Sequence, residues 1–298
     1  MHAAIRSFYL APEGLEATLG EDLVRRGAGP LVWHGRMALS GEAPVATPWA
    51  QDIGTAPVEL GAASVKVAAD ALRGMQRNWA GYAFGQHRRM ALIEARLPPV
   101  KAAALTFPAA PPGSHLGMWT LLEADRLLAS PTTGNPVPRG EWRFVEDRVG
   151  PPSRAYLKLW EALTRLGAHP GPGDVCMDLG ASPGGWTWVL AQLGAEVTAV
   201  DKAPLDPAIA AMPGVTQAIE SAFALEARAL DWLVCDVIAY PARILALLER
   251  WLPVARRVVC TVKFQGATDH EAVDRILGLP GVRVVHLFHN KHELTVLK

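Results

Sequence analysis

Residues 178–190 read DLGASPGGWTWVL, and this stretch decides the fold. An apolar run typical of a buried strand leads into a turn rich in glycine, and apolar residues at helical spacing follow. Gly180, Gly185 and Thr187 have the spacing of the phosphate-binding pattern G-x-x-x-x-G-K-S/T, but Trp186 stands where that pattern has its lysine. A strand, a glycine turn and a helix in this order predict a ligand site at the carboxyl end of the strand.

The chain around this stretch alternates between strand and helix patterns. The expected strands are residues 174–180, 195–201, 215–219, 230–237, 256–264, 282–290 and 293–298. The expected helices are residues 154–167, with Ser153 as N-cap, 185–194 and 241–252, and one that begins near Asp269. This alternation predicts an α/β domain over residues 151–298, with a mostly parallel, Rossmann-like sheet and helices on both faces.

Residues 1–110 predict a smaller α+β domain. Its expected strands are residues 7–11, 31–40 and 90–95, and its expected helices are residues 64–79 and an earlier one that carries Leu15, Leu19 and Leu23. Residues 111–150 include the turn-rich run SPTTGNPVPRGEW, and prolines are frequent there and just before. Such a stretch does not favour a long helix or a central strand, so we expect residues 111–150 to be a connecting hairpin or linker between the two domains.

The composition limits which cellular compartment and which binding partners we expect for this protein. The 29 basic residues balance 29 acidic ones, so a nucleic acid or a membrane would have to be bound by a local patch. Cys176, Cys235 and Cys260 lie in apolar runs, which is typical of a reducing compartment. No stretch of eighteen apolar residues occurs. We therefore expect a cytoplasmic protein that needs neither membrane nor metal, and we take it to be a monomer.

Basic residues are in excess between residues 70 and 101. Six of them, Arg73, Arg77, Arg88, Arg89, Arg96 and Lys101, stand against Asp70 and Glu94. A solvated face and a patch for a phosphate backbone both explain this excess. If a nucleic acid is the partner, Arg88, Arg89 and Arg154 are the candidate contacts.

Three ligand classes compete for the glycine turn. A nucleoside triphosphate is disfavoured because the lysine is missing, and a dinucleotide because Ser182 stands where the pattern G-x-G-x-x-G has its second glycine. S-adenosylmethionine has an adenosine but no phosphate, so it needs no lysine, and Trp186 can pack in that place. Asp201 follows Gly180 by 21 residues, the spacing of an acid that binds ribose hydroxyls. A turn whose glycines serve packing alone is the remaining alternative.

Charged side chains at the ends of apolar strands are the candidate catalytic groups. Asp236 closes one such strand and Lys263 closes another. A solvated strand end explains either residue alone, but two from neighbouring strands favour a site. Lys158, on the helix before the glycine turn, and Glu293, at the start of the last strand, are uninformative when taken singly.

Together, Lys158, Asp236, Lys263 and Glu293 resemble the Lys-Asp-Lys-Glu tetrad of the FtsJ-like ribose 2′-O-methyltransferases. The stretches GEWRFVEDRVGPPSRAYLKLWEAL, DLGASPGGWT, DWLVCD and FHNKHELTV are most similar to the RlmM branch, which methylates a cytidine ribose of 23S ribosomal RNA in bacteria. The resemblance runs from about Gly140 to the C-terminus. It implies RNA, most of all 23S rRNA, as substrate and S-adenosylmethionine as cofactor. The implied cofactor-binding residues are Ser153, Gly180, Ser182, Pro183, Gly184, Gly185, Trp186, Asp201, Ser221 and Asp236.

The chain departs from the family pattern in two places. Ser221 stands where the family usually has an aspartate that meets the adenine amino group, and a serine cannot make a charge-assisted hydrogen bond there. The branch also has an N-terminal RNA-binding region with a THUMP module, for which the segment before Pro151 is short. We expect residues 1–110 to hold at most a reduced form of that region.

The resemblance implies in-line attack of a ribose 2′-hydroxyl on the sulfonium methyl group. Lys263 is the expected general base, Asp236 is expected to hold it, and Lys158 and Glu293 are expected to orient the substrate. Two rivals remain: a catalytically silent RNA- or protein-binding module on the same fold, and a methyltransferase for a non-ribose acceptor. A silent module predicts a broken tetrad, whereas all four positions are filled. Amino-methylating enzymes often have an aromatic D/N-P-P-Y/F run, which CDVIAYP lacks.

Overall fold

The computed structural model describes the chain except for residues 1–3 and 114. It divides the chain into two compact units. The first comprises Met1–Ala104 and Pro112–Arg143, and the second comprises Leu105–Pro111 and Phe144–Lys298.

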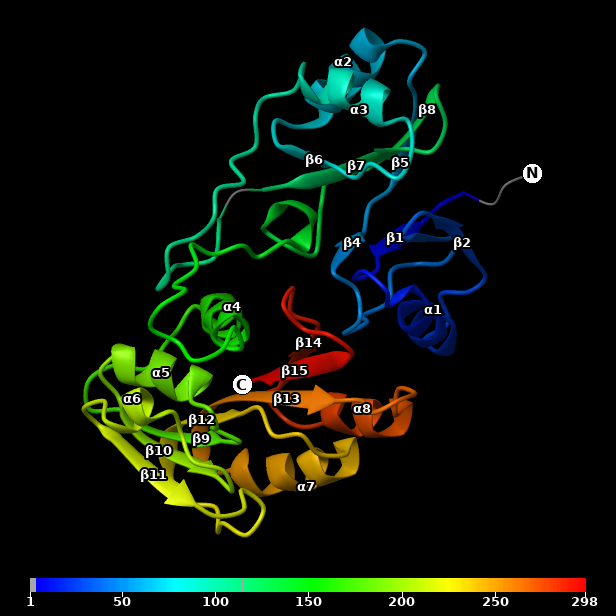
Figure 1. Ribbon diagram of the computed structural model, residues 1–298. Helices are drawn as coiled ribbons and strands as arrows, with labels where there is room; N and C mark the ends of the chain where they lie inside the picture. Colours follow the sequence, from blue (N-terminus) through cyan, green and yellow to red (C-terminus); the bar gives the residue numbers. More distant parts are fainter. Residues whose placement is uncertain (1–3, 114) are drawn as a thin grey trace. The chain divides into compact units, whose positions relative to one another are not determined.

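The second unit is built on a seven-stranded sheet in the order β11-β10-β9-β12-β13-β15-β14 (Figure 1). Its strands are β9 (Val175–Leu179), β10 (Glu196–Asp201), β11 (Val215–Ile219), β12 (Leu230–Cys235), β13 (Ala255–Lys263), β14 (Arg283–Val285) and β15 (Glu293–Leu297). Strands β9 to β13 pair in parallel, and β15 runs antiparallel to both of its neighbours. The strand order reverses next to β9, which is where an open α/β sheet binds its ligand. The α/β Rossmann-like prediction is confirmed.

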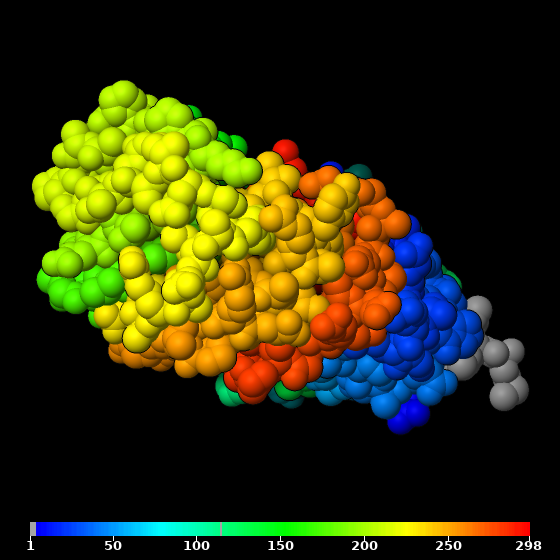
Figure 2. Space-filling view, turned by 90° about the horizontal axis from the view of Figure 1, so that it is seen from below, coloured from blue at the N-terminus to red at the C-terminus, as the bar shows by residue number. Residues whose placement is uncertain are grey.

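Helices cover both faces of this sheet. They are α4 (Tyr156–Leu166), α5 (Gly185–Gln192), the short α6 (Pro207–Ala210), α7 (Pro241–Trp251) and α8 (His270–Leu277). Helices α4 and α5 pack together on one face, and α7 and α8 pack together on the other. Figure 2 shows the residues of α7 and α8, in yellow-orange and orange, next to each other on one surface of the molecule. Trp160 on α4 packs against Phe107 and Phe144, and α4 also contacts β15 of the sheet. Even the polar residues of α4, Lys158, Glu161 and Thr164, are buried.

The first unit contains two four-stranded sheets, in the orders β2-β3-β1-β4 and β5-β8-β7-β6. The first sheet comprises β1 (Ser7–Leu10), β2 (Leu31–His34), β3 (Met37–Ser40) and β4 (Asp52–Gly54), with helix α1 (Glu16–Arg25). The second comprises β5 (Val58–Gly61), β6 (Trp79–Gly81), β7 (Gly117–Leu121) and β8 (Arg126–Ser130), with helices α2 (Val65–Met75) and α3 (His87–Glu94). A 3₁₀ turn at Pro138–Gly140 follows.

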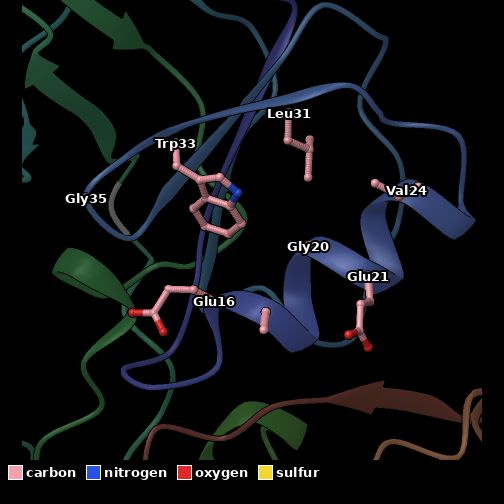
Figure 3. Close-up of a pocket in the computed structure, with 8 residues that line it drawn as sticks. Glu16, Gly20, Glu21, Val24, Leu31, Trp33 and Gly35 are labelled. Atoms are coloured by element: carbon pink, nitrogen blue, oxygen red, sulfur yellow. The ribbon is translucent and has the colours of Figure 1, made fainter.

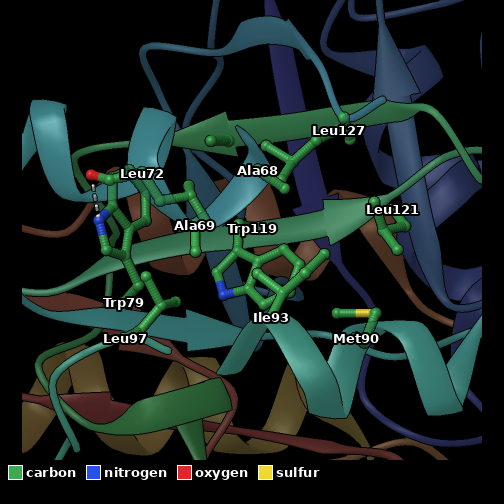
Figure 4. Packing of buried hydrophobic residues seen from close by; sticks show 12 residues of the cluster. Ala68, Ala69, Leu72, Trp79, Met90, Ile93, Leu97, Trp119, Leu121 and Leu127 are labelled. Atoms are coloured by element: carbon green, nitrogen blue, oxygen red, sulfur yellow. Dashed lines mark hydrogen bonds between the residues drawn. The ribbon is translucent and has the colours of Figure 1, made fainter. Parts of the chain in front are cut away.

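Helices α2 and α3 close one hydrophobic core against the second of these sheets. Trp79, Trp119, Leu72 and Ile93 are among its buried residues (Figure 4). The Trp79 indole N–H donates to the Leu72 carbonyl oxygen at 2.9 Å, so the one polar atom of this ring has a partner in the apolar core. Large aromatic side chains of this kind supply much of the buried area that a small unit needs.

Two expectations for the N-terminal half are wrong, and a third is wrong in part. Residues 31–40 form a hairpin of two strands, in which Gly35 has the positive φ of 57° that its tight turn needs. Residues 90–95 are mostly helical, because Met90 and Ile93 are buried at helical spacing while Leu92 is exposed. Residues 111–150 contain a hairpin of β7 and β8, but they are more than a connector, because β7 also pairs with β6 and Pro112–Arg143 belongs to the first unit.

Candidate active site

Four elements of the second unit bring the predicted tetrad together. Lys158 lies on α4, Asp236 directly follows β12, Lys263 is the last residue of β13, and Glu293 is the first residue of β15. Because β12 and β13 are parallel, their carboxyl ends meet at one edge of the sheet. The antiparallel β15 starts at that edge, and Glu293 pairs with Lys263 in the register.

The four side chains are within hydrogen-bonding distance of one another. The Lys158 Nζ atom lies 3.1 Å from both carboxylate oxygens of Asp236 and 3.1 Å from Glu293 Oε1. The Lys263 Nζ atom lies 2.9 Å from Asp236 Oδ1 and donates to the Asp236 backbone oxygen at 2.6 Å. Asp236 is therefore the centre of the cluster, with one lysine on each side.

Thr261 is a member of this site that sequence reasoning missed. Its hydroxyl donates to Asp236 Oδ1 at 2.7 Å. It stands two residues before Lys263, so the two side chains share one face of β13. A polar residue two positions before a charged strand end is the signal that could have found it.

Neighbouring charges and burial together set the protonation states of Lys158 and Asp236. Burial lowers the pKa of Lys158, but the carboxylates of Asp236 and Glu293 outweigh it, so the net pKa is raised. Burial raises the pKa of Asp236, but the two lysines and the Thr261 hydroxyl outweigh it, so the net pKa is lowered. Lys158 is therefore held as a cation and Asp236 as an anion at neutral pH.

The glycine turn forms a close backbone cradle next to the tetrad. Gly180 and Gly184 have positive φ angles of 78° and 116°, which side chains rarely adopt. A Cβ atom on Gly180 would lie 2.8 Å from Val237, the neighbour of Asp236, and one on Gly185 would lie 2.7 Å from Ser153 Oγ. The turn thus lies against the end of β12 and against the segment that leads into α4.

Two acidic residues accompany the cradle. Asp201, at the end of β10, accepts the Ser182 backbone N–H at 3.1 Å and the Ala203 backbone N–H at 2.9 Å. Asp178, in β9, is 1% exposed and accepts the Thr187 hydroxyl at 2.7 Å. Its other oxygen, Oδ1, has no hydrogen-bond partner in the described part of the chain. Burial raises the pKa of Asp178 to about 7.

Asp178 was overlooked as a site residue because it reads as one more position of an apolar strand. A buried carboxylate oxygen without a partner is costly, so its presence beside the cradle indicates a ligand that donates a hydrogen bond or carries positive charge there. The cradle and this oxygen together fit an amino-acid group, which has both an ammonium and a carboxylate.

The other predicted cofactor residues have mixed placements. Pro183 is exposed on the turn, and Ser221 follows β11 at the carboxyl edge of the sheet. Trp186 is only 2% exposed, and its indole N–H donates to the Ala155 carbonyl oxygen at 2.9 Å. The ring is thus packed against the start of α4, and a contact between Trp186 and the cofactor stays a prediction. The expected N-cap at Ser153 is wrong, because α4 starts later and Ala155 is its N-cap.

The three candidate RNA contacts differ in exposure and in whether their side chains already have partners within the chain. Arg88 is exposed, whereas Arg89 donates to the Ala62 carbonyl oxygen at 2.5 Å and has a structural role. Arg154 is exposed but pairs with Glu146 at 2.7 Å. Arg88 is therefore the clearest candidate of the three.

A separate open pocket of about 560 Å³ lies in the first unit, between α1 and β2 (Figure 3). Trp33 and Leu31 line it from β2, and Glu16, Glu21 and Val24 line it from α1. Two carboxylates make this pocket a poor place for a phosphate backbone.

The described residues place limits on metals, membranes and disulfides. None of them form a group of three or more His, Cys, Asp or Glu side chains that could hold a metal ion. In the same residues, no helix has the length and apolar character that a membrane crossing requires. Cys176, Cys235 and Cys260 are free thiols inside the core.

Comparison with protein families agrees with this geometry. Residues 151–291 match the model of the family described as FtsJ-like methyltransferase. This part of the second unit is thus similar to the FtsJ-like methyltransferases. The match spans α4, the glycine turn, Asp236 and Lys263, and it ends just before Glu293.

Curated proteins of similar sequence also match about half of the chain. A "Ribosomal RNA large subunit methyltransferase M" of Halorhodospira halophila is 42% identical over 156 residues, which are 49% of this chain and 46% of that protein. One of Alkalilimnicola ehrlichii is 36% identical over 191 residues, 57% of this chain and 51% of that protein. The chain thus spans about half the length of these relatives.

A solved structure that matches part of this chain is the 1,6-didemethyltoxoflavin-N1-methyltransferase of Burkholderia thailandensis. It has a TM-score of 0.35 and 19% identity, and the match covers 46% of this chain and 73% of that one.

Proposed function

We propose that this protein is an S-adenosylmethionine-dependent RNA ribose 2′-O-methyltransferase. The observation that carries the proposal is the assembly of Lys158, Asp236, Lys263 and Glu293 within 3.1 Å contacts at the sheet edge. This edge adjoins the glycine cradle, since the Asp236 backbone N–H donates to the carbonyl oxygen of Leu179 at 3.0 Å. A silent binding module would have no need for a complete, buried and costly charge cluster.

The cradle residues are suited to hold the cofactor. Asp201, at the end of the second strand of the fold, would bind the ribose hydroxyls. The backbone of Gly180, Gly184 and Gly185 would lie against the amino-acid part, and the free oxygen of Asp178 would accept its ammonium group. Ser221 would meet the adenine. When bound, the cofactor supplies a methyl group on a sulfonium centre that leaves as a neutral thioether.

Lys263 is the proposed general base. Its side chain is 19% exposed, against 11% for Lys158, and it contacts one carboxylate where Lys158 contacts two. A neutral Lys263 amine keeps two N–H donors for the Asp236 carboxylate and backbone oxygen, and its lone pair is then free for the ribose hydroxyl proton. Asp236 holds this amine in place, and Lys158 with Glu293 orients the ribose.

A cytidine of 23S ribosomal RNA is the proposed target. Support comes from the relatives whose name is "Ribosomal RNA large subunit methyltransferase M", together with the tetrad. Such an enzyme would act in the cytoplasm, and a monomer suffices because the whole tetrad comes from one chain.

The direct test is methyl transfer from labelled cofactor to ribosomal RNA from a strain that lacks the protein, followed by mapping of the modified nucleotide. Label on a ribose 2′-oxygen supports the proposal. Label on a base, a protein or a small molecule would show that the methyl acceptor is not a ribose. If no label were transferred to any RNA, the result would favour a silent binding module.

The role of Lys263 is tested in the same assay. Lys263→Ala should slow transfer by about 10²-fold or more, the usual contribution of a general base. Lys263→Arg should fare little better, because a guanidinium stays protonated. Lys66→Ala, at an exposed surface lysine, is the control. An arginine variant within about tenfold of wild type would leave Lys263 as a positioning group.

A further inference from the structure

Glu161 is a buried carboxylate with no part in the proposed mechanism. It lies on α4 about one turn after Lys158, and it is 0% exposed. A charged group in such a place lowers stability unless its partners are well arranged. Its partners therefore indicate what it does.

Glu161 joins α4 to the loop that leads to Glu293. Its two carboxylate oxygens lie 3.0 and 2.9 Å from the backbone N–H of Phe288, which donates to them. Arg165, one turn further along α4, pairs with Glu161 at 2.7 Å. In turn, the Arg283 side chain donates to the Arg165 carbonyl oxygen at 3.0 Å. Arg283 is the first residue of β14, so both ends of this segment connect to α4.

Residues 286–292 form the loop between β14 and β15, although the sequence predicted a strand as far as residue 290. Asn290 fixes the loop to the start of β15, because its amide donates to the Glu293 carbonyl oxygen at 3.2 Å and to Thr295 Oγ1 at 3.1 Å. Glu293 itself reaches back to Lys158 at 3.1 Å. The loop and the tetrad are thus tied to the same helix, through Glu161 and through Lys158.

We propose that Glu161 is a positioning residue for methyl transfer, which holds the 286–292 loop on α4 and thereby sets the Glu293 carboxylate against Lys158. This inference rests on the proposed function. Its physical basis is geometric, since a displacement of about 1 Å at a reacting group can cost about 10²-fold in rate.

The electrostatics of Glu161 fit this role. Burial raises the pKa of the Glu161 carboxyl, while Arg165 and the loop amides act in the opposite direction. The contacts with the loop amide and with Arg165 offset part of the cost of burial. A residue that only filled space on α4 would be cheaper as an apolar side chain.

The test compares variants that remove the loop contact with one that leaves it in place. Glu161→Ala leaves Arg165 without this carboxylate and can unfold the protein, so the main variant is Glu161→Leu combined with Arg165→Met. Replacing a buried ion pair by apolar residues of similar volume is often neutral for stability. Thr164→Ala is the matched control, because Thr164 is buried on α4 but its hydroxyl donates within the helix, to the Trp160 carbonyl oxygen at 2.7 Å.

We expect the double variant to bind cofactor as wild type does in calorimetry but to transfer methyl groups about 10- to 100-fold more slowly in single turnovers. Glu161→Gln should stay within about threefold of wild type, because its amide oxygen can still accept the Phe288 N–H. Thr164→Ala should keep the wild-type rate. In a Glu293→Ala background, the double variant should cost no further rate, because there is no carboxylate left to place.

A folded double variant that transfers at the wild-type rate overturns the proposal. So does one whose loss of rate persists undiminished in the Glu293→Ala background, since this shows a general structural effect. Amide hydrogen exchange supplies a readout without activity, and we expect residues 286–293 to exchange faster in the double variant but not in Thr164→Ala. If the wild-type protein transfers no methyl group, the proposed function fails. Independently of activity, unchanged amide exchange of residues 286–293 in the double variant would overturn the role of Glu161.

Discussion

Replacing Asp178 by asparagine should stabilise the protein at pH 8 and weaken its cofactor binding. Burial raises the pKa of Asp178 to about 7, from an ordinary value of 3.8. The folded state therefore binds a proton more tightly than the unfolded state does. The free energy of unfolding falls as pH rises from about 4 to about 7, and the full penalty remains above that.

The magnitude follows from this pKa shift. Each pKa unit corresponds to about 1.4 kcal/mol, so the charge on Asp178 costs about 4 kcal/mol at pH 8, as an upper bound. Between pH 5 and pH 8 the cost grows by about 2 to 3 kcal/mol. Asparagine has no such charge, although its amide group can lack an acceptor at a cost of about 1 to 3 kcal/mol. That cost does not change with pH. The change in the variant's relative stability between pH 5 and pH 8 therefore reports only the energetic cost of the Asp178 charge.

The assay is urea unfolding of wild type and Asp178→Asn at pH 5 and pH 8, with calorimetry of cofactor binding. We expect the stability of the variant relative to wild type to increase by about 2 to 3 kcal/mol from pH 5 to pH 8. Its affinity for S-adenosylmethionine should fall about 10- to 100-fold, as for a lost hydrogen bond to a charged group. A relative stability that does not change with pH would refute the buried-charge reasoning. An unchanged affinity would remove Asp178 from the cofactor site.

Two further predictions concern the cofactor and the RNA. Asp201→Ala should weaken cofactor binding by about 1 to 3 kcal/mol in calorimetry, while NAD and ATP fail to compete, and tight ATP binding would contradict the assignment. Arg88→Glu should weaken RNA binding and make the salt slope of the binding constant shallower by about 1 or more, without change in cofactor affinity. Methylation as fast as wild type at 0.2 M salt would make Arg88 part of a solvated face.

Most strands and helices of the second unit could be predicted from the sequence, because the local apolar patterns agree with the fold there. The strand at Val175–Leu179, the glycine turn and the helix at Gly185–Gln192 follow from apolar runs with clear stops. Asp236 and Lys263 were recognisable because charge at the end of an apolar strand is unusual. Their contact with Lys158 and Glu293 depends on strand order, which the family resemblance supplied and periodicity did not.

The first unit was harder to predict because its strands are short and depend on distant partners. Strand β7 lies in a proline-rich region, yet the run GMWTL contains no proline and pairs with β6, about 38 residues earlier in the chain. Residues 90–95 looked like a strand because one helical turn has too few apolar positions to separate the two periods. The motif also defines the position of Trp186 in the turn, but only tertiary packing decides which way its indole points.

The contrast between the two tetrad lysines comes from their contacts alone. Lys158 and Lys263 are chemically identical, yet Lys158 touches both carboxylates and Lys263 touches only that of Asp236. Removing a proton from Lys158 would leave two carboxylates without their shared cation, whereas removing one from Lys263 leaves every carboxylate paired with Lys158. The four groups then have a net charge of −1, which favours a cationic cofactor nearby. The contacts therefore favour different roles under the proposed function: Lys158 keeps the charge cluster together, and Lys263 acts as the general base.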